Sequence, residues 1–415
     1  MIGRVKDIVR PAWKGAATVA ALAALTVLAF AQSLDVRRRR ARGDLPRVVW
    51  GPTPMISIKY WSQSLRQLGF QSTTLVHSVY PAFKREDFDL HFDAFGPRTA
   101  RLRFLAPYYA FAWSLRNADV FAFFFDGGYL AATPLRWLEC QLVKLAGKRT
   151  LLTSYGSDIA VPGTLGAVES AIYESYPDLR VRGPQIRRRV LYFTRQADFV
   201  VRCMQAGFTP RWDLIWPNYL AIDTELWKPT ADATDADART SEVVVVHPSN
   251  HRAIKGTEHL VRAVDELRSE GLHLRLEMVE GRPNDEVRAA MAKADIVGEQ
   301  FIGGYGMTAV EAMSLGRPVI SNLSWLGPEF WEGTCLRECP IVNATPDTLK
   351  GELRRLATEP ALRRQLGQAG RQYVTRYHST QAIGAIWASV LRHIWLREPI
   401  ESKVTSQFAS RVETG

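Results

Sequence analysis

The chain has 415 residues, of which 47% are hydrophobic. That is enough for about two to three domains with filled cores, and it excludes a largely disordered protein. The formal net charge is +11. An excess of this size suits nucleic acid, an anionic membrane or a phosphorylated ligand, so charge selects none of them. Four cysteines in so long a chain form no disulfide framework and predict a reducing compartment.

The N-terminal segment 1–44 contains an uncharged stretch from Gly15 to Leu34. As a helix this stretch is long enough to cross ~30 Å of hydrocarbon. The run RRRRAR at 37–42 follows it, and such a cluster marks the cytoplasmic flank of a membrane segment. We therefore predict a membrane anchor or a membrane-surface helix on the cytoplasmic face. The AFA at 29–31 also fits a cleaved secretory signal, and an ordinary packed helix remains an alternative.

The region 45–229 alternates short apolar runs with longer amphipathic segments. The runs are RVVWG, STTLVHS, DVFAFFFDGG, RTLLTSYGSD, ADFVVRC and WDLIWPN. Strands that alternate with helices predict a parallel sheet covered on both faces, as in Rossmann-like domains. The segment 98–113, RTARLRFLAPYYAFAW, has helical spacing that is typical of a core helix with a solvated edge, and a membrane-facing helix is the alternative.

A polar segment divides the chain near its middle. TADATDADARTSE, from Thr230 to Glu242, has no large apolar residue and predicts a linker at 230–241. A second α/β domain is expected at 242–384, with strands in EVVVVHPSN, LRLEMVE, ADIVGEQ and RPVISN and a helix over Glu258–Glu270. A C-terminal helix and tail are expected at 385–415. Two α/β domains of this kind normally bind a ligand between the carboxyl ends of their strands.

A glycine-rich loop follows the predicted strand ADIVGEQF. Its glycines at 303, 304 and 306 remove side chains where the backbone must approach something closely. The helix that begins near Met307 offers free N–H groups and the positive end of its dipole, which together form an anion site. Glu311, one turn into that helix, can accept paired hydrogen bonds from a diol such as ribose. A plain glycine turn with a solvated glutamate is the alternative.

A second loop, HPSNHRAIKGT at 247–257, follows the first strand of the same domain. It places Arg252 and Lys255 three residues apart, directly before a helix. The arginine fork and the compact lysine charge together suit a diphosphate. Because both loops belong to one domain, they support one diphosphate site.

Other kinds of chemistry find little support. The first strand is followed by WGPTPMIS rather than GxGxxG, and neither GxSxG nor HExxH occurs. DFD at 87–89, DAD at 235–237 and CLREC at 335–339 imitate metal motifs but lack the partners of a metal site. Nucleic-acid binding rests on net charge alone. We therefore expect no metal, no other cofactor and no nucleic-acid partner.

These loops carry a family resemblance. HPSNHRAIKGT, ADIVGEQFIGGYGMTAVEAMSLGRPVI and CPIVNATPDTLKGELRRLATEPALRRQLGQAGRQYVTRYHS resemble successive blocks of the donor domain of GT-B glycosyltransferases, closest to the retaining family 4 group. LLTSYGSDI and WPNYLAIDTELWKP resemble the end of the acceptor-side domain and the crossover between domains. The resemblance implies two Rossmann-like domains that face each other across a cleft, preceded here by the apolar N-terminal helix.

The resemblance also implies roles for individual residues. Arg252 and Lys255 would hold the diphosphate of a nucleotide sugar, and Glu311 would hold its ribose. The further predicted contacts to the donor are Gly304, Tyr305, Gly306, Met307, Thr308 and Gly51. Tyr155 and Asp158 are the acceptor-side candidates.

Two positions depart from the family pattern. The first glutamate of the family's pair, eight residues before Glu311, is Gly303 here, and Glu299 is the expected substitute. A histidine that often precedes the GSD segment is Tyr155. The resulting prediction is a glycosyltransferase that uses a nucleotide-sugar donor and a glycan or lipid-linked acceptor, in cell-surface polysaccharide synthesis. A non-catalytic membrane-tethered nucleotide or glycan binder and a nucleotide-sugar epimerase of the same fold are the alternatives.

Overall fold

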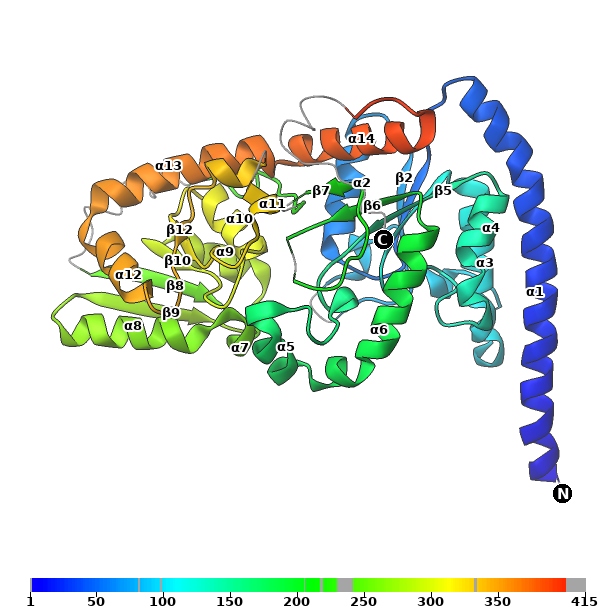
Figure 1. Ribbon diagram of the computed structural model, residues 1–415, viewed down its shortest axis with the longest axis horizontal. Helices are drawn as coiled ribbons and strands as arrows, with labels where there is room; N and C mark the ends of the chain where they lie inside the picture. Colours follow the sequence, from blue (N-terminus) through cyan, green and yellow to red (C-terminus); the bar gives the residue numbers. More distant parts are fainter. Residues whose placement is uncertain are drawn as a thin grey trace.

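The computed structural model describes residues 2–80, 83–97, 99–204, 206–216, 219–229, 242–331 and 334–400. These residues form two α/β domains, each built on a parallel sheet, that lie side by side (Figure 1). A long helix, α1 (Ile2–Ala41), runs along the outer side of the first domain. The predicted fold class is confirmed.

The first sheet has seven strands in the order β3-β2-β1-β4-β5-β6-β7, and all neighbours are parallel. Its strands are β1 (Val48–Trp50), β2 (Ser72–Val76), β3 (Leu90–His91), β4 (Val120–Phe124), β5 (Arg149–Thr153), β6 (Phe199–Arg202) and β7 (Leu214–Ile215). Each of the six predicted runs contains one strand. All five residues of β4 are buried, as expected for a strand covered on both faces.

Among the described residues of this domain, five α-helices besides α1 accompany the sheet. They are α2 (Ile56–Gln67), α3 (Ala106–Asn117), α4 (Glu139–Leu145), α5 (Glu169–Ser175) and α6 (Pro177–Gln196). Helix α2 shows how they pack, since its apolar residues Ile58, Trp61 and Leu65 share one face and are buried. Helix α3 begins within the segment 98–113 and extends beyond it, and it buries most of its apolar residues, with Tyr109 left 49% exposed.

The second sheet has five parallel strands in the order β12-β11-β10-β8-β9. They are β8 (Val243–Pro248), β9 (Leu274–Val279), β10 (Ile296–Gly298), β11 (Val319–Ser321) and β12 (Val342–Asn343). The helices are α7 (Arg252–Lys255), α8 (Thr257–Ser269), α9 (Asn284–Ala292), α10 (Met307–Ser314), α11 (Pro328–Trp331), α12 (Leu349–Thr358) and α13 (Pro360–Tyr377). The predicted linker at 230–241 lies outside the described residues.

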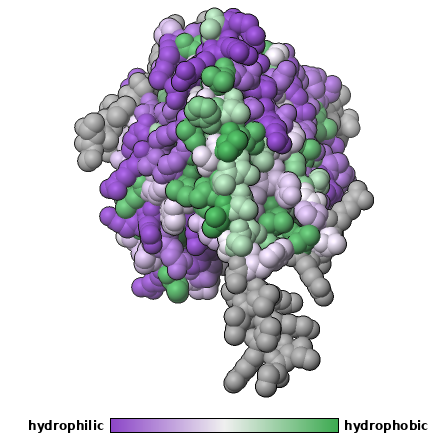
Figure 2. All heavy atoms as spheres, turned by 90° about the vertical axis from the view of Figure 1, so that its right-hand side faces the viewer, coloured by the Kyte–Doolittle hydropathy of each residue, from purple (hydrophilic) through white to green (hydrophobic). Residues whose placement is uncertain are grey.

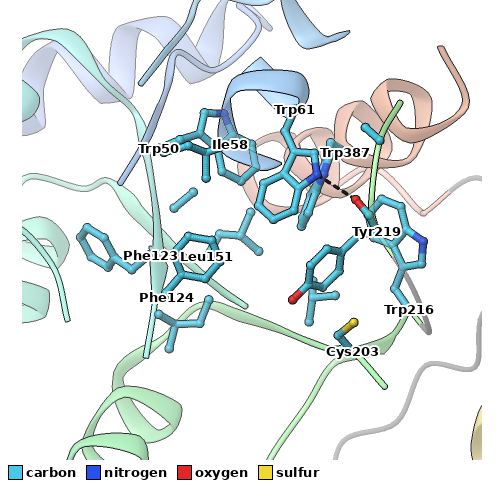
Figure 3. Close-up of a cluster of buried hydrophobic side chains, with 14 of the residues drawn as sticks. Trp50, Ile58, Trp61, Phe123, Phe124, Leu151, Cys203, Trp216, Tyr219 and Trp387 are labelled. Atoms are coloured by element: carbon cyan, nitrogen blue, oxygen red, sulfur yellow. Dashed lines mark hydrogen bonds between the residues drawn. The ribbon is translucent and has the colours of Figure 1, made fainter. Parts of the chain in front are cut away.

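The last helix, α14 (Thr380–Leu396), returns to the first domain (Figure 1). Its Trp387 packs against Trp50, Trp61 and Trp216 at ring-centroid distances of 5.2, 5.1 and 4.9 Å. Figure 3 shows this cluster, in which the Trp61 indole N–H donates to the backbone oxygen of Tyr219 at 2.8 Å. Residue 384, the predicted end of the second domain, therefore lies within a helix that belongs to the core of the first.

Candidate functional site

A cavity of about 940 Å³ lies between the two domains. The first domain lines it with residues that include Met55, Tyr155 and Tyr176, and the second with residues that include Gln300 and Trp325. Tyr155 follows β5 and Gln300 follows β10, so the cavity lies at the carboxyl ends of both sheets. This is where open α/β sheets bind ligands.

The predicted glycine loop lines this cavity from 303 to 306. It is held by the residues that end β11, because Ser321 Oγ donates to the oxygen of Gly304 at 2.6 Å and the Gly304 N–H donates to the oxygen of Asn322 at 2.7 Å. Gly304 has a φ of 85°, a left-handed conformation that favours glycine. The loop therefore has a defined shape that delivers the chain to the start of α10.

Lys255 and Glu299 meet at the start of α10. The Lys255 ammonium forms an ion pair with Glu299 Oε1 and lies 3.4 Å from Thr308 Oγ1. Glu299 Oε2 accepts a hydrogen bond of 2.9 Å from the N–H of Gly306. The Glu299 side chain is fully buried and that of Lys255 is 16% exposed. The buried carboxylate thus holds a cation beside N–H groups that have no partner within the helix.

Glu311 lies one turn into α10 and is only 8% exposed. Burial raises the pKa of its carboxyl group to about 8, although the charge of Lys255 and a hydrogen bond with Asn284 act in the opposite direction. The group is therefore largely protonated at neutral pH in the free protein. Hydroxyl groups of a ligand that donate to it would favour the ionised form.

Arg252 does not join this cluster. Its guanidinium group pairs on the surface with Glu258 at 2.7 Å and with Glu280 at 3.1 Å, and its side chain is 46% exposed. Lys255, on the same short helix, is the residue of the predicted pair that the structure places with Glu299. The loop also positions His251, whose Nε2 lies 3.1 Å from the hydroxyl of Tyr176 in the first domain.

The two acceptor-side candidates have different environments. The Tyr155 hydroxyl donates to Asp126, and Asp126 pairs with Arg189 at 3.1 Å. Asp158 is fully buried and accepts from the N–H groups of residues 125, 155 and 156 at 3.0, 3.0 and 2.9 Å. Burial and the nearby Asp126 raise the pKa of Asp158 to about 7. Asp158 therefore braces the loops after β4 and β5, whereas Tyr155 lines the cavity.

Gly51 and Tyr305, two other predicted contacts to the donor, make structural contacts within their own domains. Gly51 has a φ of 145°, and a Cβ atom there would lie 2.0 Å from the oxygen of Leu75, so packing against β2 requires a glycine. Tyr305 lies in the glycine loop, but its hydroxyl points into the second domain, 3.2 Å from that of Tyr373 and 3.3 Å from His378 Nε2. Its hydroxyl is therefore engaged within the second domain.

Trp325 is one of the cavity residues that sequence reasoning missed. Its indole ring lies against Gly303, where a Cβ atom would be 2.7 Å from Nε1. The ring thus occupies the space into which a side chain at 303 would extend. The signal in the sequence was its position, because Trp325 lies in the loop directly after the predicted strand RPVISN.

The metal-like motifs have other partners. Asp87 pairs with Lys59 at 2.6 Å and Asp89 with Arg66 at 2.8 Å. DAD at 235–237 lies outside the described residues. Within the described ranges, no three His, Cys, Asp or Glu residues are grouped to hold a metal ion, and Cys335 and Cys339 are free thiols.

The fold defines the class: two facing parallel-sheet domains with a shared crossover helix form the GT-B fold. Sucrose-phosphate synthase from Thermosynechococcus elongatus superposes with a TM-score of 0.54 at 17% identity, covering 85% of this chain and 99% of that one. HepE from Anabaena, solved with UDP-glucose, gives a TM-score of 0.52 at 14% identity, with 83% and 99% covered.

Sequence comparison adds one curated relative. MMP alpha-(1->4)-mannosyltransferase from Mycolicibacterium hassiacum is 26% identical over a region that covers 40% of this chain and 45% of the relative. The chain thus spans less than half the length of that relative. No family model matches.

Proposed function

We propose that this protein is a glycosyltransferase that moves a sugar from a nucleotide donor to a glycan or lipid-linked acceptor. The observation that carries the proposal is the group formed by Lys255, Glu299 and the start of α10, with Glu311 one turn further on. It lies in the second domain at the carboxyl ends of the strands, beside the cavity between the domains.

The donor would bind with its diphosphate at the start of α10. Helix N–H groups and the Lys255 ammonium supply the positive partial and full charges that a diphosphate needs. Glu311 would accept from the ribose hydroxyls. HepE, which shares the fold, was solved with UDP-glucose and with UDP and glucose, and this supports a nucleotide-sugar donor for the proposed enzyme.

The same groups would serve transfer itself. Charge develops on the departing nucleoside diphosphate, and donors that are already in place stabilise it without reorganising. If the transferred sugar keeps its anomeric configuration, the acceptor attacks from the same face as the leaving group. The phosphate of the leaving group then assists deprotonation of the acceptor. In that case no side chain has to act as the nucleophile. We propose that the reaction uses neither a metal nor another cofactor.

The acceptor would enter from the first domain, where Tyr155 lines the cavity. We place the reaction at the cytoplasmic face of a membrane, in cell-surface polysaccharide assembly. The uncharged part of α1 and the arginines at 37–40 support that location, since basic residues beside an apolar helix favour the cytoplasmic side.

A panel of nucleotides and nucleotide sugars, including UDP and UDP-glucose, tests the proposal by thermal shift. A ligand at 100 times its Kd adds about 2.7 kcal/mol to the free energy of unfolding. Lys255→Ala should reduce the shift, whereas Lys293→Ala, at an exposed position of the same domain, should keep it. If no nucleotide shifts the melting temperature, the donor site is refuted. Binding without any product from labelled donor in membranes would leave a non-catalytic binder.

A further inference from the structure

Helix α1 has an inner face that is part of the first domain. Leu25, Ala29 and Val36 are 3%, 0% and 1% exposed and share one side of the helix. They lie against α3 and α4, and a Cβ atom at Gly147, just beyond α4, would be 3.2 Å from Val36 Cγ1. These residues dock one narrow face of α1 on the first domain, while most of the helix stays outside the core.

Both ends of this packed stretch are also held. At one end, the ring of Trp13 contacts Phe104 at 5.3 Å between centroids. At the other end, Arg39 pairs with the buried Asp119 at 3.3 Å, and the Arg40 guanidinium lies over the ring of Trp395 at 4.1 Å. At 1.5 Å per residue, the helix follows the protein for about 40 Å. While it is docked in this way, lipid cannot surround it.

The outer face of α1 is apolar and uncovered. Its large exposed residues are Val19, Val27, Phe30 and Leu34, at 69%, 71%, 65% and 53%. Alanines fill half of the positions between them, and no charged residue stands between Lys14 and Asp35. Figure 2 shows the result as a continuous hydrophobic band along the helix, between hydrophilic surfaces.

The neighbours of α1 oppose a transmembrane orientation. Helices α3 and α4, on which it packs, carry the exposed charges of Arg116 and Lys144. A bundle of these helices that crossed a bilayer would carry those charges toward hydrocarbon, which is costly. If only the outer face of α1 contacts the lipid, these charges stay out of the hydrocarbon.

The charge around the band indicates what covers it. Residues 13–44 hold six basic and two acidic side chains, and the exposed Arg37 and Arg38 follow Leu34 after the exposed Asp35 and the buried Val36. Basic residues that border an apolar helical face suit anionic lipid head groups. A second copy of a chain with a net charge of +11 would instead bring like charges together.

We propose that α1 lies in the plane of an anionic membrane surface with its outer face in the lipid, and that it stays docked on the first domain and does not span. This extends the membrane location proposed above and is independent of sugar transfer. The docked helix would fix the orientation of the first domain relative to the membrane surface. It would therefore also fix the direction in which the cavity opens.

Depth measurements distinguish the two orientations. Val19→Cys, Val27→Cys and Leu34→Cys in the full chain would each carry a polarity-sensitive fluorophore, and the parent chain, whose Cys339 is partly exposed, corrects for background. On sealed phosphatidylcholine–phosphatidylglycerol vesicles, we expect similar shallow depths at all three sites. We also expect a quencher that cannot cross the bilayer to reach positions 19 and 34 equally. A deep signal at 27 with one end protected would show a spanning helix and overturn the proposal.

A second measurement uses substitutions on the two faces. Val27→Asp and Phe30→Asp should weaken binding to these vesicles by about tenfold or more without lowering the melting temperature. Val181→Asp, at a position on α6 that is 79% exposed, is the matched control and should bind normally. Unchanged binding of both α1 variants would overturn the proposal. So would vesicle-independent dimers of the parent that dissociate on substitution, because a second copy would then cover the band.

Discussion

At the residue scale, the candidate donor site depends on how three ionisable groups share one small space. Glu299 is fully buried, yet it holds both the Lys255 ammonium and the Gly306 N–H. Glu311 is also buried and has no comparable set of donors, so burial raises the pKa of its carboxyl to about 8. The site thus pairs one carboxylate that orients a cation with a second carboxyl group left for a ligand.

Removing that cation should impair turnover more than folding. We expect Lys255→Ala to lower kcat by about a hundredfold, because loss of one preorganised electrostatic donor commonly costs ~3 kcal/mol in the transition state. Lys293→Ala is the control. Steady-state rates with labelled donor measure the effect, and parental rates in a correctly folded Lys255→Ala protein would place the leaving-group site elsewhere.

Glu311 allows a prediction in which stability and binding change in opposite directions. The folded pKa of about 8 lies above the ordinary value of 4.5, so the unfolded chain releases this proton first and the free protein loses stability as pH rises from about 4.5 to 8. Glu311→Gln should therefore stabilise the free protein at pH 8, by on the order of a few kcal/mol. Nucleoside diphosphate binding should weaken by roughly 1.5 to 3 kcal/mol. Denaturant melts at pH 5 and pH 8, with calorimetric titration, would show both changes, and a destabilised variant at pH 8 would contradict the pKa argument.

Gly303 and Trp325 form a pair that can be tested by double substitution. Gly303→Ala places a methyl group 2.7 Å from the indole nitrogen, so we expect the glycine loop to shift and nucleotide-sugar binding to weaken. Trp325→Ala removes the obstruction, and the double variant should bind better than Gly303→Ala alone. A double-mutant cycle by calorimetry measures this coupling. Additive losses would show that the two residues act separately.

At the element scale, α14 joins the C-terminal part of the chain to the core of the first domain. It begins at Thr380, after α13 has crossed the second domain, and places Trp387 among three tryptophans of the first (Figure 3). A helix remote in sequence thus completes the core beneath β1 and α2. The core of the first domain therefore depends on α14, which follows the whole second domain in sequence.

Trp387→Ala should expose this dependence. Large-to-small substitution of a buried aromatic residue usually costs about 3–5 kcal/mol, because a cavity remains. We expect the first domain to unfold at lower denaturant concentration while nucleotide binding to the second domain persists. Tryptophan fluorescence and nucleotide titration along the same denaturation series separate the two. Loss of nucleotide binding before the fluorescence change would contradict the assignment of α14 to the first domain.

At the scale of the whole molecule, the two domains meet where two connecting segments of the chain lie side by side. Ile222 and Ser379 form a parallel bridge there. His378 lies fully buried beside it, with Nδ1 2.9 Å from the oxygen of Leu220 and Nε2 3.3 Å from the hydroxyl of Tyr305. One imidazole ring therefore contacts both the crossing segment and the glycine loop.

This crossing should be sensitive to acid. Burial lowers the pKa of His378 to about 4 from 6.5, so the unfolded chain takes up a proton first as pH falls. The stability from the neutral ring is present above pH 6.5 and is lost between about 6.5 and 4. We expect His378→Asn to be less stable at pH 7 but to lose less on acidification than the parent. Unfolding free energies at pH 7 and pH 5 test this, and equal losses would assign the acid sensitivity to other groups.

The alternation of apolar runs and amphipathic segments determined the α/β class and two parallel sheets, because a strand buried on both faces must be apolar along its length. β3 and β12 have two residues each and were not predicted as strands, whereas the equally short β7 lies in the predicted apolar run WDLIWPN. The glycine loop and Glu311 were also predictable from spacing, because they are neighbours in one loop and helix.

Only the tertiary structure decided that Lys255 pairs with Glu299, that Arg252 pairs with Glu258 and Glu280 instead, and that Trp325 fills the space beside Gly303. Apart from Arg252 with Glu258, which are close in sequence, those contacts join separate loops, and their partners depend on how the sheets bring strand ends together. The same holds for α1, whose composition permits several orientations, whereas its packing on α3 and α4 leaves one face free.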